Sequence, residues 1–340
     1  MNKREMTSAE RVMAAIHNRP FDFFPAINPT SVATADTMHL SGAYFPSAHT
    51  NSAEMAALAA MGHDYFGFDT VAPYFSVHLE AAALGAKIDW SDVNSTPKVV
   101  KTVMKRIDDF SLPASFLSRA EFQRLLKTCR SLRKKYGGTV PVVGKVVGPW
   151  TLAYNLYGVE NLILDTILEP DKTKALIREL SQVPMEFAKA QFEAGADIVT
   201  WAEHSTSDLV SAQVYEEFVM PVHRQAAATL QVYGPLILHI CGNVMDRLDC
   251  IADTGFRLFH MDSRNDIKKA VKQVGDRIVL TGCINNPATL AQGTPAVVRK
   301  EAEYNLSCGI RLISPECALP TNVPEENLRE LVDTVHRHKP

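Results

Sequence analysis

The chain has 340 residues, of which 46% are hydrophobic and 21% are charged, with a formal net charge of -3. This is ordinary globular composition, and its charge balance offers no basic stripe that would hold a nucleic-acid backbone. No apolar run reaches the roughly 18 residues that a membrane span needs, and the first residues lack the apolar core of a secretory signal. We therefore expect a cytoplasmic protein with reduced cysteines that contacts neither nucleic acid nor membrane.

Short apolar segments rich in β-branched residues recur along the chain, as in the strands of a parallel sheet buried on both faces. In chain order they span residues 25–30, 64–69, 141–148, 197–203, 235–241, 257–262, 277–283 and 310–317. Most are separated by stretches whose apolar spacing of three and four predicts helices, clearest at 120–138, 173–196 and 296–309. Eight such units predict an α/β fold of the (β/α)₈ TIM-barrel type.

One domain over residues 1–340 is expected, because no convincing linker interrupts the pattern. Residues 1–24 should form an N-terminal helical extension, since Thr7 and Glu10 have the spacing of a capping box. The polar segment 86–118 is interpreted as a long excursion from the barrel. The alternative fold, a doubly wound open sheet, would want a glycine-rich turn after the first strand, and the sequence has none there.

The sequence LILHICGN, residues 236–243, ends an apolar strand in a histidine and a cysteine. Side chains at positions i and i+2 of a strand point the same way, so His239 and Cys241 should project side by side. Each alone has an ordinary interpretation, because a single histidine or cysteine at a strand end is usually a core residue. Together they are half of a metal site or a coincidence.

Other polar residues follow the neighbouring strands, at the face where a TIM barrel carries its chemistry. They are Glu203, Asp262, Cys283, Asn285 and Cys317. Two thiolates and an imidazole favour zinc over magnesium or calcium, and three protein ligands would leave the exchangeable fourth position of a catalytic zinc. Glu203 and Asp262 are interpreted either as catalytic and ligand-orienting groups or as solvated charges at the rim. Cys283 is ambiguous.

Several motifs resemble the uroporphyrinogen decarboxylase superfamily, a barrel family. They are LEAAALG (79–85), GPWTLAYNLYG (148–158), LHICGN (238–243), HMD (260–262), GCINNPATL (282–290) and ISPECALPTNVPEENLREL (313–331). The decarboxylase itself needs an arginine-rich glycine motif near the first strand and an aspartate after the second. Here the first region has no arginine and Ser76 takes the approximate place of the aspartate, so decarboxylation is not expected.

The branch that the sequence resembles instead is the methylcobamide:coenzyme M methyltransferases, whose zinc motif is His-x-Cys followed much later by a cysteine. His239, Cys241 and Cys317 match it, with 75 residues between the two cysteines. The resemblance implies Zn²⁺ on these three residues and cofactor-binding roles for Glu80 and Asn243. It departs from the branch at Cys317, which follows Pro-Glu where a glycine- and cysteine-rich turn is common.

The resemblance implies methyl transfer from a methylated corrinoid to a zinc-bound small thiol, such as coenzyme M or homocysteine. The chain has no Asp-x-His-x-x-Gly corrinoid motif, so the corrinoid should arrive on a separate partner protein. Glu203 or Asp262 would accept the thiol proton or orient a ligand. Two other classes stay open: a methyl-donor:corrinoid methyltransferase that uses extra carboxylates such as Glu203 and Glu217, and a metal-free binding protein or decarboxylase relative.

Overall fold

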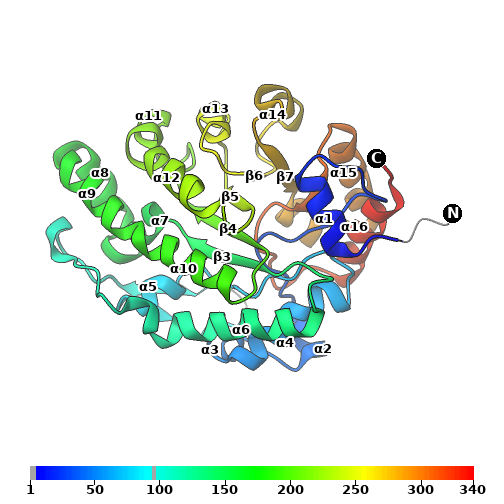
Figure 1. The fold of residues 1–340 in the computed structure, drawn as a ribbon, viewed down its shortest axis with the longest axis horizontal. Helices are drawn as coiled ribbons and strands as arrows, with labels where there is room; N and C mark the ends of the chain where they lie inside the picture. The colour runs from blue at the N-terminus through cyan, green and yellow to red at the C-terminus, as the bar shows by residue number, and fades with distance from the viewer. Residues whose placement is uncertain (1–4, 94–96) are drawn as a thin grey trace.

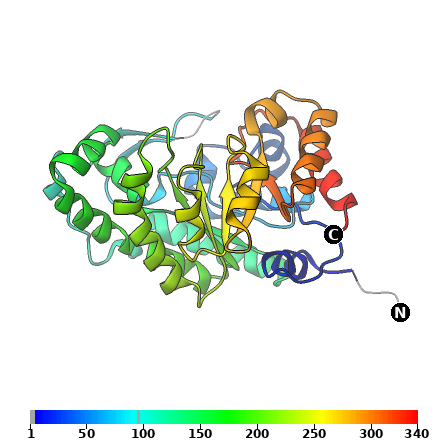
Figure 2. The same cartoon turned by 90° about the horizontal axis from the view of Figure 1, so that it is seen from above.

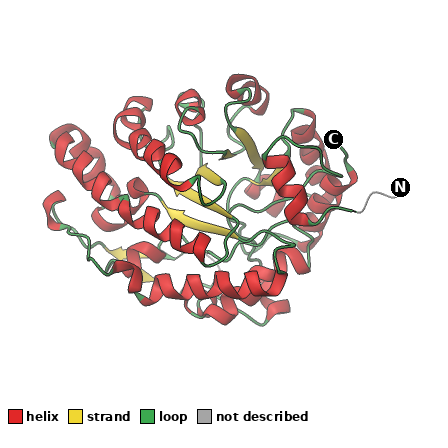
Figure 3. Ribbon diagram, viewed as in Figure 1, coloured by secondary structure: helices red, strands yellow, loops and turns green. Residues whose placement is uncertain are grey.

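The centre of the molecule is a parallel sheet of six strands in sequential order, surrounded by helices (Figures 1 and 3). This computed structural model describes residues 5–93 and 97–340. The strands are β3 (Val143–Val147), β4 (Ile198–Glu203), β5 (Leu236–Ile240), β6 (Leu258–Met261), β7 (Val279–Ile284) and β8 (Leu312–Pro315). Nearly every residue in them is buried, as expected for strands with helices on one face and a barrel interior on the other.

Two irregular extended segments close the sheet into a barrel. Ala26 forms a parallel bridge with Ile313 of β8, and Val71 forms one with Val142, beside β3. The two segments also meet, because the amide of Asp69 donates to the carbonyl of Ala26 at 2.7 Å. The predicted TIM-barrel architecture is therefore confirmed, and its first two strand positions are occupied by extended segments that form single β-bridges.

The second predicted strand, 64–69, was placed wrongly. Asp64 is the last residue of a helix, and the parallel bridge at the second strand position of the barrel lies further along the chain, at Val71. The helix persists because residues 52–64 are rich in alanine, leucine and methionine, which favour helix in the absence of any internal proline.

The predicted helical stretch 173–196 is two helices with Ser181 between them. Pro184 has no backbone N–H, so it cannot bond the carbonyl of Leu180 and the first helix ends there. The α-helices in chain order are α1 (Ser8–Ile16), α2 (Ala35–Ser41), α3 (Ser47–Thr50), α4 (Ser52–Asp64), α5 (Leu79–Ala83), α6 (Ala120–Tyr136), α7 (Pro149–Tyr157), α8 (Val159–Leu168), α9 (Pro170–Leu180), α10 (Gln182–Glu193), α11 (Ala212–Val214), α12 (Met220–Leu230), α13 (Leu248–Ala252), α14 (Ile267–Val274), α15 (Pro295–Ser307) and α16 (Glu325–Arg337).

The segment interpreted as an excursion carries a small antiparallel hairpin of β1 (Lys87–Asp89) and β2 (Lys98–Lys101). Two 3₁₀ turns, η1 (Ile107–Asp109) and η2 (Phe116–Ser118), follow it, and π-helical turns η3 (Tyr215–Val219) and η4 (Asn286–Ala291) occur later. Residues 1–4 of the predicted extension and 94–96 of the excursion lie outside the described residues. The single-domain organisation stays a prediction.

Seen from above in Figure 2, the strands lie in the middle of the molecule. The green helices α7 to α9 extend to one side of them and the orange and red helices α15 and α16 to the other. Among the described residues no helix combines the length and apolar character needed to cross a membrane.

The N-terminal end of the barrel is filled by an apolar cluster. Val12 and Ile16 of α1 pack there against the first inward-facing residues of the strands and the two extended segments, which are Ile27, Ala72, Val143, Ile198, Ile237, Leu258 and Leu312. Helix α1 begins with the expected capping box, in which the Thr7 hydroxyl accepts from the amide of Glu10 and the Glu10 carboxylate accepts from the amide of Thr7. Because side chains alternate, residues two and four positions further along each strand point into the barrel nearer its other end.

Candidate metal centre at the carboxyl ends of the strands

His239 and Cys241 lie at the end of β5 on the inner face of the barrel. They follow Ile237, which belongs to the apolar cluster at the N-terminal end, and each is two residues beyond the last inward residue. The Nε2 atom of His239 is 3.0 Å from the Sγ atom of Cys241. The side-by-side arrangement predicted from the strand period is therefore present.

Cys317 completes a cluster of three donor atoms. It follows β8, and its sulfur lies 3.1 Å from that of Cys241 and 3.5 Å from Nε2 of His239. In the described part of the chain this is the one group of three or more metal-competent side chains found, with donor atoms within 4.8 Å of one another. The hydrogen bond between the two sulfurs lowers the pKa of the Cys317 thiol and raises that of Cys241, because the pair holds one proton more readily than two thiolates side by side.

The orientation of His239 suits a metal ligand. Its Nδ1 lies 3.3 Å from the carbonyl oxygen of His260, which can only accept, so Nδ1 carries the proton and Nε2 turns its lone pair toward the two thiols. Two thiols and one such imidazole are the donor types that Zn²⁺ prefers, and three ligands leave one position for an exchangeable group. The residues present therefore fit a zinc ion of the catalytic kind.

His260, which the sequence analysis did not single out, braces the two halves of the cluster. Its backbone carbonyl receives the bond from His239, while its Nε2 donates to the carbonyl of Pro315 at 2.7 Å, two residues before Cys317. Burial lowers the pKa of His260 to about 3, so the ring is neutral and donates from Nε2 alone. The signal available in the sequence was its alternation with Asp262 on the inward face of β6.

Asp262 holds the turn that carries Cys241. One carboxylate oxygen accepts from the amide of Gly242 at 2.8 Å and the other from the amide of Arg264 at 2.9 Å. Gly242 has φ of +96°, and a Cβ atom there would lie 2.4 Å from the hydroxyl of Thr206, so only glycine fits this turn. This geometry supports the ligand-orienting interpretation of Asp262.

Glu203 is buried but lies outside the cluster. Its carboxylate accepts from the amide and hydroxyl of Thr151, at 2.9 and 2.6 Å, and from the amide of Trp150 at 3.3 Å. These groups are at the positive N-terminal end of α7, which a carboxylate stabilises. Gly148 is required beside it, because a Cβ atom there would come within 2.0 Å of the carboxylate. Glu203 therefore fixes the start of α7, and its catalytic role stays a prediction. Glu217 is paired with Lys174 at 2.6 Å.

The two residues expected to bind the cofactor lie in different environments. Glu80, in α5, is fully buried and accepts hydrogen bonds from the hydroxyl of Tyr74 and, at 2.8 Å, from the amide of Val147. Burial raises the pKa of Glu80 to about 7. Asn243 is exposed, and its side chain accepts from the amide of Met245 at 3.0 Å within the turn after Cys241. Cofactor binding by either residue stays a prediction.

Cys283 and Asn285 are not members of the donor cluster. Cys283 is fully buried at the end of β7, and burial raises its pKa well above the usual value. Asn285 caps the π-helical turn η4, where its side-chain oxygen accepts from the amide of Ala288. The open question about Cys283 is thus decided in favour of a packing role.

Two basic side chains that the sequence analysis missed approach the cluster. Lys145 is an inward residue of β3 with 2% of its surface exposed, and His204 follows β4 directly. Burial lowers the pKa of Lys145 to about 8 and also lowers the pKa of His204, and the charge of Cys317 opposes the effect of burial at both groups. A lysine inside the otherwise apolar strand PVVGKVVG was the signal that could have revealed Lys145.

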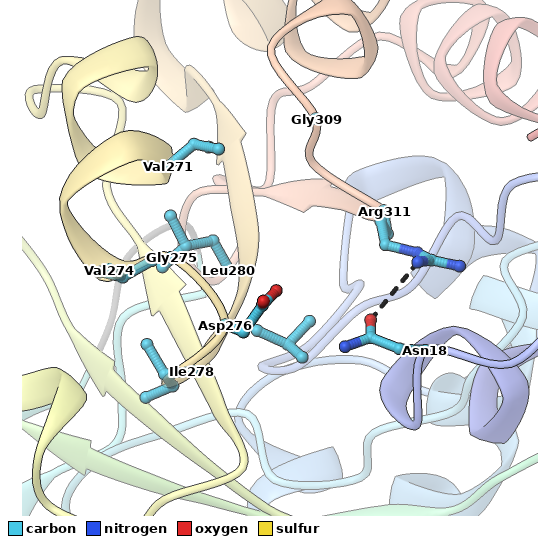
Figure 4. A pocket seen from close by; sticks show the side chains of 10 residues that line it. Asn18, Val271, Val274, Gly275, Asp276, Ile278, Leu280, Gly309 and Arg311 are labelled. Atoms are coloured by element: carbon cyan, nitrogen blue, oxygen red, sulfur yellow. Dashed lines mark hydrogen bonds between the residues drawn. The ribbon is translucent and has the colours of Figure 1, made fainter.

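Cavities lie at both ends of the barrel. Figure 4 shows one of about 370 Å³ near the starts of β7 and β8, where Arg311 donates to the side-chain oxygen of Asn18 at 3.4 Å. It is at the amino-terminal end of the strands, the end that in TIM barrels serves stability. A second, of about 290 Å³, is lined in part by Phe75 and by Ala318 and Leu319, the two residues that follow Cys317 in the chain.

The fold and the donor cluster define the class of this protein as a TIM barrel with a group of three side chains that could hold a metal ion at the carboxyl ends of its strands. The family model of uroporphyrinogen decarboxylase (URO-D) matches residues 7–338, and the chain belongs to that family.

Full-length relatives are methyltransferases by name. Methylcobamide:CoM methyltransferase MtbA of Methanosarcina acetivorans is 32% identical, over 98% of this chain and 99% of that protein. A methylated-thiol–coenzyme M methyltransferase of Methanosarcina mazei is 31% identical, over 96% and 89%. A solved structure of a methyltransferase from Methanosarcina mazei superposes with a TM-score of 0.94 at 30% identity, covering 98% of this chain and 99% of that one. The resemblance to the methylcobamide:coenzyme M methyltransferase branch is thereby confirmed.

Proposed function

We propose that this protein is a zinc-dependent methyltransferase that moves a methyl group from a methylated corrinoid, carried by a separate protein, to a small thiol such as coenzyme M. The observation that carries the proposal is the convergence of His239, Cys241 and Cys317 on one point at the carboxyl ends of the strands. The names of the full-length relatives support both the corrinoid and the thiol.

The residues of the cluster would hold the ion as two thiolates and one neutral imidazole. When bound, Zn²⁺ supplies the charge that keeps a coordinated thiol deprotonated at neutral pH, which is the nucleophilic form. His260 keeps Nε2 of His239 directed at the site, and Asp262 fixes the backbone after Cys241. The two cysteines cancel the formal charge of the ion, so a substrate sulfur would retain more electron density than at a site of three histidines.

The donor and the opening of the barrel impose a second requirement. Because the sequence has no corrinoid motif of its own, a corrinoid protein must present its methyl group at the carboxyl ends of the strands. The runner-up function, a methyl-donor:corrinoid methyltransferase, depended on extra carboxylate ligands. Glu203 is bound to the start of α7 and Glu217 to Lys174, so no described carboxylate joins the donor cluster.

The test is methyl transfer by the purified, zinc-loaded protein with methylcobalamin and a series of thiols. We expect methyl thioether to form with coenzyme M or another small thiol, and about one proton to be released when that thiol binds the metal. X-ray absorption at the zinc edge should show one additional sulfur neighbour. Failure of every thiol, together with methylation of cob(I)alamin by a methylated oxygen or nitrogen compound, would replace this function by the runner-up.

A further inference from the structure

Lys145 is a buried cation in the interior of the barrel. It lies on β3 between Val143, which packs in the apolar cluster at the N-terminal end, and Val147, whose amide donates to Glu80. Residues two apart share a face, so Lys145 points inward with them. Only 2% of its surface is exposed. An ammonium group in this position is costly unless something compensates its charge.

The chain itself supplies little compensation. The Nζ atom lies 4.6 Å from the centre of the Tyr74 ring, and within residues 5–93 and 97–340 no hydrogen bond or ion pair to it is present. The charges that act on Lys145 are those of Cys317 first, then Glu80 and Cys241, and none of these groups makes a hydrogen bond or ion pair with it. Both oxygens of Glu80 are engaged, one by Tyr74 and one by Val147. The geometry therefore leaves one cation free to receive a partner from outside the chain.

The surroundings of Lys145 connect it to the donor cluster and to the adjacent cavity. Burial lowers the pKa of Lys145 to about 8, and the charges of Cys317, Glu80 and Cys241 oppose that effect, so the group stays mostly protonated at neutral pH. On the cavity side, burial first and then Lys145 lower the pKa of His49 to about 4. The charge of Lys145 therefore interacts with the two thiols and with His49, which lines the cavity of about 290 Å³.

We propose that Lys145 is the specificity-determining residue for the thiol substrate, and that it binds an anionic group, a sulfonate or a carboxylate, at the end opposite the sulfur. This inference rests on the proposed function and names its substrate class. A thiol with one negative end group would place its sulfur at the cluster and its charge on Lys145. A zwitterionic amino-acid thiol would bring an ammonium group as well, for which the engaged Glu80 offers no free oxygen.

The test is a binding series on zinc-loaded protein by calorimetry, with Lys145→Met and Lys145→Arg as variants and Lys127→Met, an exposed site on α6, as the matched control. The probes are 2-mercaptoethanesulfonate, 3-mercaptopropionate, neutral 2-mercaptoethanol, cationic cysteamine and zwitterionic homocysteine. The unaltered protein should prefer the two anionic thiols over 2-mercaptoethanol by about 10- to 100-fold, the size of one charge-assisted hydrogen bond. Lys145→Met should reduce that preference to less than about threefold by weakening the anionic thiols alone, and Lys145→Arg should keep part of it.

Equal weakening of neutral and anionic thiols in Lys145→Met would overturn the proposal, because Lys145 would then act on the metal-bound sulfur. Unchanged binding would overturn it as well, and so would tighter binding of homocysteine than of the anionic thiols. Zinc content and thermal unfolding of each variant show that the fold and the metal are intact. Ethanesulfonate, which has no thiol, separates this inference from the proposed function. If no thiol is methylated but ethanesulfonate binding still requires Lys145, the anion site stands and the methyl transfer does not.

Discussion

The two ends of the barrel are built from the same strands but obey different rules. At the amino-terminal end the inward residues are aliphatic, as Ile237 and Leu258 are, and α1 packs over them. Two to four residues further along the same two strands the inward positions are His239, Cys241 and His260, which are polar and hydrogen-bonded. One end supplies burial and the other carries the donor cluster, so mutations should change the stability of the fold and the binding of zinc separately.

The largest effect is expected from removing a donor. Cys317→Ala should weaken zinc binding by at least about 10³-fold, because it removes one of three ligands and leaves Cys241 without its sulfur neighbour. Zinc content after dialysis against a metal buffer measures this, and circular dichroism should show an intact fold. Cys250→Ala, at a half-buried cysteine outside the cluster, is the control. Full zinc retention in Cys317→Ala would mean that the third ligand is another residue.

The opposite result is expected at the apolar end. Ile16→Ala should lower the free energy of unfolding by about 2–5 kcal/mol, the range for truncating a fully buried isoleucine, with zinc stoichiometry unchanged. Urea unfolding monitors the first quantity and metal analysis the second. Ile167→Ala removes the same atoms from a side chain that is 78% exposed on α8, and should change stability by less than about 0.5 kcal/mol. Loss of zinc from folded Ile16→Ala would show that the two ends are coupled.

A smaller effect at the metal end should come from the support of the ligands. Asp262→Asn keeps the size of the side chain but replaces one of its two accepting oxygens with an NH₂ group, which can only donate. The turn after Cys241 therefore loses the hydrogen bond from the amide of Gly242 or of Arg264. Zinc affinity should fall by about 10- to 100-fold, as is typical for residues that orient ligands. Competition with a chelating dye measures it. Asp208→Asn, which alters an exposed ion pair with Arg264, should leave affinity unchanged, and equal losses in both variants would contradict the assignment.

The smallest effect concerns pH. Burial raises the pKa of Glu80 to about 7 in the folded protein, above its ordinary value of 4.5, so the folded state binds this proton more tightly. That contribution to stability is complete below pH 4.5 and is lost as pH rises to about 7. Between pH 5 and pH 7.5 the free energy of unfolding of Glu80→Gln should therefore fall by roughly 2 kcal/mol less than that of the unaltered protein. Urea unfolding at the two pH values tests it, with Glu186→Gln on the surface of α10 as control; identical pH slopes for all three proteins would refute it.

The parts of this structure that the sequence predicted are those governed by local periodicity. Short apolar runs predict the six strands of the sheet, and alternation along one strand predicts that His239 and Cys241 lie side by side. The second strand was predicted at the wrong residues because its pairing is a single bridge at Val71, a long-range contact that produces no periodic pattern in the sequence. The anchoring of Glu203 on α7 was also hidden, since it depends on how two distant segments pack.

Two groups inside the barrel, Lys145 and His260, also depend on contacts between distant segments. Lys145 lies in an apolar run, which predicts only that the strand is buried. The neighbouring residues in the sequence do not indicate which charged groups lie near the Lys145 side chain in the folded barrel. His260 was quoted as part of a motif, but its bonds join β5, β6 and β8 and exist only once the barrel closes. Interactions that need three strands at once are invisible to a pattern that describes one.

The packing of Val12 and Ile16 against the starts of the strands has a consequence for the order of events during turnover. In the proposed reaction, the thiol, its methylated product and the methyl-bearing partner would all use the opposite end, because apolar side chains fill the amino-terminal end of the barrel. A partner docked over that end would cover the route by which the product leaves. Each cycle would then alternate in time: the partner delivers and departs, the thioether leaves, and a new thiol enters before the next partner arrives.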